Sequence, residues 1–282
     1  MPDRLRPLWD FDDLDGSEAR FRAQLDAEKT PQGRAEVLTQ LARVEGLRGD
    51  FGASAALLQS AEETAGPSPL ANVRVLLERG RMLRSSGRPE EALPLFEAAF
   101  ADAVGIGEYY LAGDAAHMAA IAVSDRDGME SWTQRGLKLG ETEPDASYWA
   151  APLLNNLAWA YQEDGDNERA LDLFQRALAA RELDQENPDA IAFARYGVGF
   201  ALRALGRSDE AVAMLEPAVS WADSTGKSDP YYHGELAEAY ADAGRRDDAR
   251  EHARTSIALL ERDGLADTES ERVARLRGLA SD

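Results

Sequence analysis

Apolar and polar residues alternate with a helical period through residues 153–180, and this stretch shows the pattern that organises the chain. It divides into two segments around the turn EDGD at residues 163–166. The apolar residues of the first segment recur at steps of three and four and are Leu154, Leu157, Ala158 and Tyr161. Those of the second segment are Ala170, Leu171, Phe174, Ala177 and Leu178. Such steps place the residues on one face, so two amphipathic helices are predicted, and neither can bury its face without similar neighbours.

The turn glycine of this helix pair recurs along the chain. Glycine followed by Asp or Arg occurs at Gly49, Gly87, Gly165, Gly206 and Gly244. The gaps are 38, 78, 41 and 38 residues, and the gap of 78 is twice 39. One of six repeats therefore lacks its glycine, and its turn is expected at residues 124–127, the run SDRD.

Prolines mark the expected helix starts with a similar period. Pro31, Pro69 and Pro188 each lie 18 residues before a turn glycine. Pro144 and Pro230 take the same role with gaps of 21 and 14 residues. Proline is tolerated at a helix start because the first helical amides have no internal partner. Two independent marks with one period predict an array of helix pairs.

These helix pairs resemble the tetratricopeptide repeat family, on the pattern LA..Y...GD...A...F..AL of residues 157–178. The resemblance covers roughly residues 33–260 in six units, of which the second, fourth, fifth and sixth match well. The first unit is weaker because Ser54 replaces the usual alanine, and the third is weakest because it lacks the turn glycine. The runs DAAHM and NNLAWAY are most similar to a bacterial branch of the family. The resemblance implies an all-α, right-handed superhelical solenoid of about six tetratricopeptide-like helix pairs with capping helices.

Three regions are expected along the chain. Residues 1–32 comprise an N-terminal segment and a leading helix, residues 33–262 the repeat array, and residues 263–282 a C-terminal capping segment. Apolar residues on one face predict a helix near each end, with Phe21 in the first and Val273 in the last. Two alternatives stay open for the aromatic residues before the leading helix, which could pack on it or remain loose.

Composition narrows the classes of function. The net charge is −21, from 52 acidic and 31 basic residues, which argues against nucleic acid because phosphate affinity depends on clustered cations. There is no cysteine, so disulfides, thiolate metal sites and thiol catalysis are excluded. No apolar run is long enough for a membrane helix, and the first residues lack the apolar core of a secretory signal. A cytoplasmic protein is the plain expectation.

Three histidines offer little for catalysis. Asp114 and His117 are three residues apart on a predicted helix, a spacing that could support a general base in a hydrolase-type enzyme. The alternative is that His117 is a polar residue between helices, because it takes the place of Asn156 in the fourth unit. His233 and His252 are expected at the surface. We therefore predict no catalytic residue, no metal and no cofactor.

The family resemblance implies that the first helix of each unit lines a concave groove. The residues that this places in the groove, and that we take as candidates for binding a peptide, are Arg43, Arg74, Arg81, Arg84, His117, Asn155, Trp159, Gln162, Tyr196 and Arg203. Asn can bond main-chain amides, aromatic side chains supply contact area, and Arg pairs with carboxylates. The aromatic residues could instead pack only between repeats, and acidic neighbours such as Glu36 and Glu78 could neutralise the arginines locally.

The predicted function is a non-enzymatic scaffold that holds an extended segment of a protein or peptide partner, of acidic character, in the groove. A peptide-sensing module of a regulatory system is the first alternative. An enzyme centred on the Asp114 and His117 pair is the second. Neither a nucleic acid nor a membrane is expected as a partner.

Overall fold

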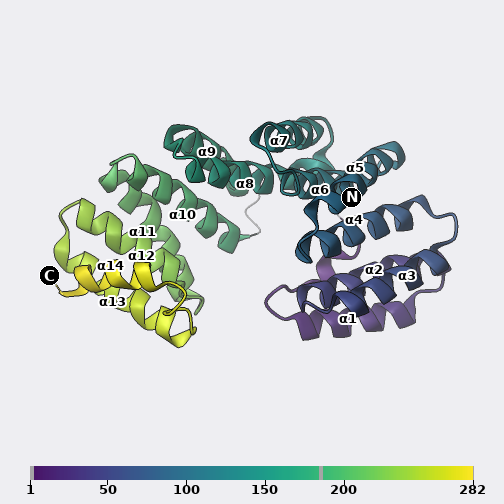
Figure 1. Ribbon diagram of the computed structural model, residues 1–282, viewed down its shortest axis with the longest axis horizontal. Coiled ribbons are helices and arrows are strands. Elements are labelled where there is room, and N and C mark those ends of the chain that lie inside the picture. The colour runs from purple at the N-terminus through teal and green to yellow at the C-terminus, as the bar shows by residue number, and fades with distance from the viewer. Residues whose placement is uncertain (1–2, 184–186, 282) are drawn as a thin grey trace. The chain divides into compact units, whose positions relative to one another are not determined.

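The computed structural model describes residues 3–183 and 187–281, and every regular element in these two ranges is helical (Figure 1). Six helices are the first members of pairs: α2 (Pro31–Leu47), α4 (Pro69–Ser85), α6 (Tyr109–Ala120), α8 (Ala150–Glu163), α10 (Pro188–Ala204) and α12 (Pro230–Asp242). Their second members are α3 (Phe51–Ala65), α5 (Pro89–Ile106), α7 (Arg126–Thr142), α9 (Asn167–Leu183), α11 (Ser208–Ser224) and α13 (Arg246–Arg262). The predicted all-α fold of six helix pairs is confirmed.

Further helices lie before and after the six pairs. The leading helix is α1 (Leu14–Ala27) and the closing helix is α14 (Ser270–Ser281). Two short 3-10 helices complete the described chain, η1 (Arg6–Leu8) and η2 (Pro144–Trp149). Both terminal helices were expected from their apolar faces, and each packs on the neighbouring pair, α1 on α2 and α14 on α13.

The turn within each pair follows from its glycine. Gly49, Gly87, Gly165, Gly206 and Gly244 all have φ between 73° and 82°. Residues with a Cβ rarely adopt this left-handed conformation, whereas glycine does so at no steric cost. The recurring glycine in the sequence therefore marks the turn that reverses the chain between two helices.

Capping side chains fix the starts of most first helices. Thr30, Ser68 and Asn187 each accept a hydrogen bond from the main-chain N–H three residues on, and a proline follows each of them. Asp229 caps α12 in the same way through the N–H groups of Tyr231 and Tyr232. The cap satisfies an N–H that has no partner inside the helix, and the proline fixes a helical φ at the next position.

The irregular spacings in the sequence have local structural causes. The third pair turns without glycine. Helix α6 ends at Ala120, and Asp125 caps the start of α7 by accepting from the N–H of Gly128. Pro144 begins η2 rather than an α-helix, which adds a turn before α8 and lengthens the gap to Gly165. The short gap after Pro230 arises because α12 has only 13 residues.

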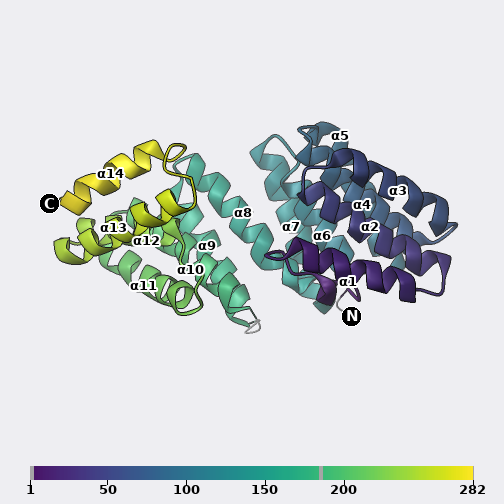
Figure 2. The ribbon, with the colours of Figure 1, turned by 90° about the horizontal axis from the view of Figure 1, so that it is seen from below.

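The described chain forms two compact units, Met1–Leu153 and Leu154–Asp282, each with its own buried residues. In unit 1, one cluster surrounds Phe21 beneath α1 and α2, and a larger one surrounds Phe96 between α4, α5 and α6. In unit 2, helices α12, α13 and α14 lie next to one another (Figure 2), and a buried cluster around Leu260 joins them. Within each unit the helices pack on neighbours one or two positions along the chain, as in a helical solenoid. No helix in the described ranges is both long and apolar enough to cross a membrane.

Glycines inside the first helices let the two helices of a pair approach closely. A Cβ added at Gly80 would lie 2.5 Å from the ring of Phe96, and one at Gly199 would lie 2.5 Å from Leu215. At Gly197 the same atom would lie 2.6 Å from Phe174 of α9, which belongs to the preceding pair. Glycine in the first helices therefore allows close approach both within a pair and between neighbouring pairs.

We expect Gly80→Ala to destabilise the protein by about 1–3 kcal/mol, because Phe96 is fully buried and has no room to move. The matched control is Gly105→Ala in α5, where the added methyl group would meet nothing within 4 Å. Alanine favours the helix by up to about 1 kcal/mol, so Gly105→Ala should be neutral or stabilising. Urea unfolding of both variants checks this, and equal effects would contradict the close packing.

Candidate functional site

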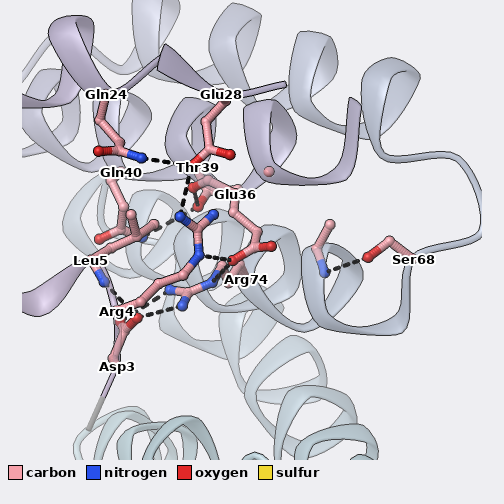
Figure 3. A network of polar contacts seen from close by, with 12 residues as sticks. Asp3, Arg4, Leu5, Gln24, Glu28, Glu36, Thr39, Gln40, Ser68 and Arg74 are labelled. Atoms are coloured by element: carbon pink, nitrogen blue, oxygen red, sulfur yellow. Dashed lines mark hydrogen bonds and ion pairs between the residues drawn. The ribbon is translucent and has the colours of Figure 1, made fainter. Parts of the chain in front are cut away.

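The first helices of unit 1 carry a network of arginines and carboxylates on one face (Figure 3). Arg74 of α4 donates from its Nη1 to Asp3 Oδ2 over 3.1 Å and also binds the second oxygen of Asp3 through Nη2. Its Nε lies 3.4 Å from Glu36 Oε2. Burial works against the charge of Arg74, but Asp3 and Glu36 outweigh it and raise the pKa of the guanidinium. Arg74 is therefore a buried cation that is neutralised from within the chain.

A second set of charges lies deeper on the same face, around Arg81. Its guanidinium forms a direct ion pair with Asp114 of α6 and donates to Glu78 Oε1 over 2.7 Å. Burial opposes the charge of Arg81, yet these two carboxylates raise its pKa. Arg84, one turn further along α4, donates to the main-chain oxygen of Ile121 over 3.1 Å. Acidic neighbours thus neutralise Arg74 and Arg81, which was the alternative that the sequence left open. That these arginines bind a partner stays a prediction.

Arg43 of α2 has weaker ionic contacts than Arg74 and Arg81. Among the described residues its nearest carboxylate oxygen is Glu78 Oε1, at 3.9 Å. The guanidinium lies over the rings of Trp9 and Phe11, with 5.3 Å to each centroid. Burial and the nearby Arg81 lower the pKa of Arg43 from its ordinary value. Arg43 consequently gains more from an additional anion than Arg74 and Arg81 do, because carboxylates of the chain already hold those two.

A cavity of about 240 Å³ lies within this face of unit 1. Charged residues from α2, α4 and α6 line it together with rings from several elements. Its lining includes Asp3, Trp9, Phe11, Arg43, Arg74, Glu78, Tyr110, Asp114, His117 and Trp149. We call the surface of α2, α4 and α6 that lines this cavity the unit 1 groove.

His117 lies between helices, as one of the two interpretations of the sequence predicted. Its ring stacks on Trp149 with 5.2 Å between the centroids. Burial lowers the pKa of His117 to about 4, so the imidazole is neutral at pH 7. Asp114, its proposed partner in catalysis, is held by Arg81. In the described ranges no three His, Asp or Glu side chains are grouped as metal ligands.

Unit 2 presents a different surface on its first helices. Five aromatic side chains from α8, α10 and α12 lie next to one another, namely Trp159, Phe193, Tyr196, Phe200 and Tyr232. Neighbouring centroids are between 5.0 and 6.5 Å apart. Tyr196 is buried, Phe193 is 44% exposed, and the other three are half-buried. We call this set the aromatic surface.

The rings of the aromatic surface also contribute to packing within unit 2. Trp159 meets the buried ring of Phe174 of α9 edge-on, with 4.9 Å between the centroids. It therefore holds α8 on α9 while its remaining area joins the surface. The sequence left open whether the aromatic residues contact a peptide or only pack between repeats. In the structure the set contributes to packing and also leaves rings exposed.

Polar groups lie on the same first helices of unit 2. Asn155 and Gln162 of α8 each have a buried amide oxygen without a hydrogen-bond partner in the described chain. Arg203 of α10 donates to Glu235 from its Nε and pairs with Glu238 at 2.8 Å. Burial opposes the charge of Arg203, but these carboxylates raise its pKa. Arg203 thus resembles Arg81 in being neutralised by the following repeat.

Three features of these surfaces were not found from the sequence. Residues 3–11 lie against α2 and α4, although no helical period marks them. Tyr232 joins the aromatic surface and could have been found from the proline register of the sixth unit. The expectation that His233 lies at the surface is wrong, because it is 3% exposed, with Nε2 3.1 Å from Asp223 and Nδ1 2.9 Å from His252.

The low pKa of His117 predicts a pH-dependent loss of stability. As the pH falls below about 6.5 the unfolded chain binds a proton at His117, whereas the folded protein does so only near pH 4. The stabilising contribution is therefore present above pH 6.5 and is lost towards pH 4. Between pH 7 and pH 5 we expect the wild type to lose up to about 2 kcal/mol more than His117→Gln, measured by urea unfolding. Equal losses would show that His117 titrates normally.

Comparison with known proteins places these surfaces in a family. A sequence model described as tetratricopeptide repeat matches residues 153–188, and a second with the same description matches residues 73–98, 192–217 and 230–255. The matched stretches fall in the second, fourth, fifth and sixth units, which are the four that follow the pattern best. No match to a curated protein was found.

Solved structures with the same arrangement of helices come from proteins of diverse kinds. BtubC from P. vanneervenii has a TM-score of 0.62 at 18% identity, over 77% of this chain and 94% of that one. A STAND-type signal transduction ATPase from Pyrococcus horikoshii, with a tetratricopeptide repeat sensor, has a TM-score of 0.68 at 14% identity, over 92% and 42%. The APC/C hetero-tetramer Cut9-Hcn1 gives 0.65 at 16% identity, over 93% and 46%.

These identities show the fold alone, and the present chain spans less than half of the second and third matched chains. The repeat models, the six helix pairs and the shared arrangement agree with one another. The chain is a tetratricopeptide repeat protein.

Proposed function

We propose that this protein-interaction scaffold is non-enzymatic and binds an extended segment of a partner protein on the first helices of its repeats. The observation that carries the proposal is the aromatic surface of unit 2. Its rings come from three successive first helices, so a chain laid across them would meet each repeat in turn. Tetratricopeptide repeats supply the scaffold, and the groove is the part that we propose.

The exposure of the aromatic surface supports contact with a partner. Phe193 is 44% exposed and its ring stacks beside that of Tyr196, so its exposed area belongs to a group of adjoining rings and not to a single scattered residue. Aromatic rings bury a large area and lose little conformational entropy on binding, and they are enriched among residues that dominate interfaces. Apolar or aromatic side chains of the partner are therefore the expected contacts in unit 2.

The amide groups of α8 support an extended rather than a helical partner segment. Asn155 and Gln162 carry amide oxygens that have no hydrogen-bond partner among the described residues. These oxygens are buried, so each amide has to turn outward before it can accept from a partner. An extended segment offers main-chain N–H groups as donors, whereas a helix uses its own internally. Burial without a partner is costly, so a main-chain donor at this position would improve binding.

The charges of unit 2 set a limit on the partner. Arg203 is surrounded by Glu235, Glu238 and Asp242, so this end of the surface carries a net negative charge. A partner carboxylate placed there would be repelled. The acidic character that we propose for the partner therefore concerns unit 1, where Arg43 and Arg74 lie.

The contacts of unit 1 do not support catalysis by Asp114 and His117. The Arg81 guanidinium holds the carboxylate, and a histidine with a pKa of about 4 is a weak base.

Among the matched structures, one contains a repeat sensor and another is a hetero-tetramer, as their descriptions state. A sensing role remains the alternative that a bound signalling peptide would favour.

Removing two rings should weaken peptide binding to unit 2. We expect Phe193→Ala with Tyr232→Ala to lower the affinity for captured peptides at least about 30-fold, because each lost aromatic contact contributes roughly 1–2 kcal/mol at an interface. The measurement is a selection of displayed random peptides on the wild-type protein, followed by fluorescence anisotropy of the best binders against the variant.

The matched control is Trp221→Ala in α11. This ring is 37% exposed, close to the value for Phe193, but it belongs to a second helix and lies outside the aromatic surface. Binding should be retained in this control, and circular dichroism should show that all variants keep their helices. Equal binding by the double variant and the wild type would mean that the aromatic surface is not the site.

A further inference from the structure

Residues 3–11 lie across α2 and α4 in unit 1, and residues 4–8 of this segment form a turn followed by the 3-10 helix η1. The segment forms one wall of the cavity in the unit 1 groove, through Asp3, Trp9 and Phe11. It reaches α1 through an exposed stretch that includes Phe11, 44% exposed, and Asp13. Its position is that of a ligand that the chain itself supplies.

Charges at the start of the segment match those of the groove in alternation (Figure 3). Asp3 uses both carboxylate oxygens on the guanidinium of Arg74. The next residue, Arg4, donates to Glu36 over 3.1 Å and to Glu28 over 2.7 Å. Two-pronged binding of a carboxylate by arginine is both strong and directional, and it is a common means of recognising a peptide.

Apolar contacts continue the same mode of binding. Leu5 is 1% exposed and packs in the cluster that contains Val37 and Leu41 of α2. Four residues on, the indole Nε1 of Trp9 donates to Gln40 Oε1 over 2.9 Å, and Arg43 covers the ring. An acid, an aliphatic residue two positions later and an aromatic residue four positions after that thus occupy three separate places, of which the first and third line the cavity and the second lies in the cluster beneath α1 and α2.

The segment leaves part of the groove open. The cavity of about 240 Å³ is lined by the segment and also by Tyr110, Asp114 and Trp149. Arg43, whose nearest carboxylate oxygen is 3.9 Å away, also lines this space. A longer partner could replace the contacts of the segment and in addition fill the cavity and meet Arg43.

We propose that residues 3–11 are an exchangeable intramolecular ligand of the unit 1 groove, and that a partner displaces them with a segment carrying a carboxylate, an aliphatic side chain and an aromatic ring at the places of Asp3, Leu5 and Trp9. This assigns a second binding site and its ligand chemistry, and the part that concerns a partner rests on the proposed function. The covalent link keeps the segment at a high local concentration, so only a partner that gains further contacts displaces it.

The experiment converts the tethered segment into a free ligand without refolding the protein. A specific protease site is inserted between Phe11 and Asp12, and the folded full-length protein is then cut. We expect the released segment to separate from the protein on gel filtration while circular dichroism stays unchanged. A fluorescein-labelled peptide of residues 3–11 should then bind the emptied protein saturably in fluorescence anisotropy, and should bind the uncut protein far more weakly.

Two peptides with the same change of charge test the contact with Arg74. Asp3→Asn should weaken rebinding about 10-fold or more, because it removes a charge-assisted, two-pronged contact. Asp10→Asn is the matched control, since the Asp10 side chain accepts only from the N–H of Asp12 within the same part of the chain. Equal affinities for the two peptides would contradict the proposed place of the carboxylate.

Displayed random peptides selected on the emptied protein test the partner. We expect binders that share the acid, aliphatic and aromatic spacing, that compete with the peptide of residues 3–11 and that are not selected on the uncut protein. Retention of the cut segment against excess labelled peptide, or loss of helix on its release, would make it a permanent part of the fold and overturn the proposal. If the uncut protein forms a dimer and Asp3→Asn dissociates it, the segment binds the groove of a second copy instead. Rebinding does not involve the aromatic surface, so either site can fail without the other.

Discussion

The fold depends on how closely the two helices of each repeat can approach. Small residues make this possible, and at Gly80 and Gly199 even a methyl group would collide with a buried side chain of the partner helix. Close approach lets one large residue of the second helix, such as Phe96, be fully buried against the first helix. The first helices are then free on their opposite side, which is where the unit 1 groove and the aromatic surface lie. Packing inside the repeats thus determines which side chains remain for a partner.

The net charge of −21 does not describe the charge around the arginines of the first helices, because several of these are paired locally. The arginines of the first helices are matched by carboxylates of the same or the next repeat, as Arg81 is by Asp114 and Arg203 by Glu235. Removal of one member would leave the other buried and uncompensated, which costs more than the pair itself contributes. These pairs join successive first helices and so bear on the rigidity of the surface as well as on recognition.

Much of the fold could be predicted from the sequence, because glycine at a left-handed turn and proline after a capping residue are local requirements. The six pairs follow from such marks, the turn without glycine from their spacing, and both terminal helices from their apolar faces. The place of residues 3–11 could not be predicted, since contacts such as that of Asp3 with Arg74 obey no period. The same holds for His233, whose burial depends on His252 of another helix. The sequence places side chains on a face, whereas their pairing depends on the next repeat.

The contact between Asp3 and Arg74 also bears on the order in which the chain is made. Most helices touch partners one or two elements away, so each repeat can fold soon after it leaves the ribosome. Asp3 is synthesised 71 residues before Arg74, and its binding surface needs α2 and α4 together. Residues 3–11 therefore emerge early but dock late. During that interval both the segment and the groove are open to other molecules in the cell.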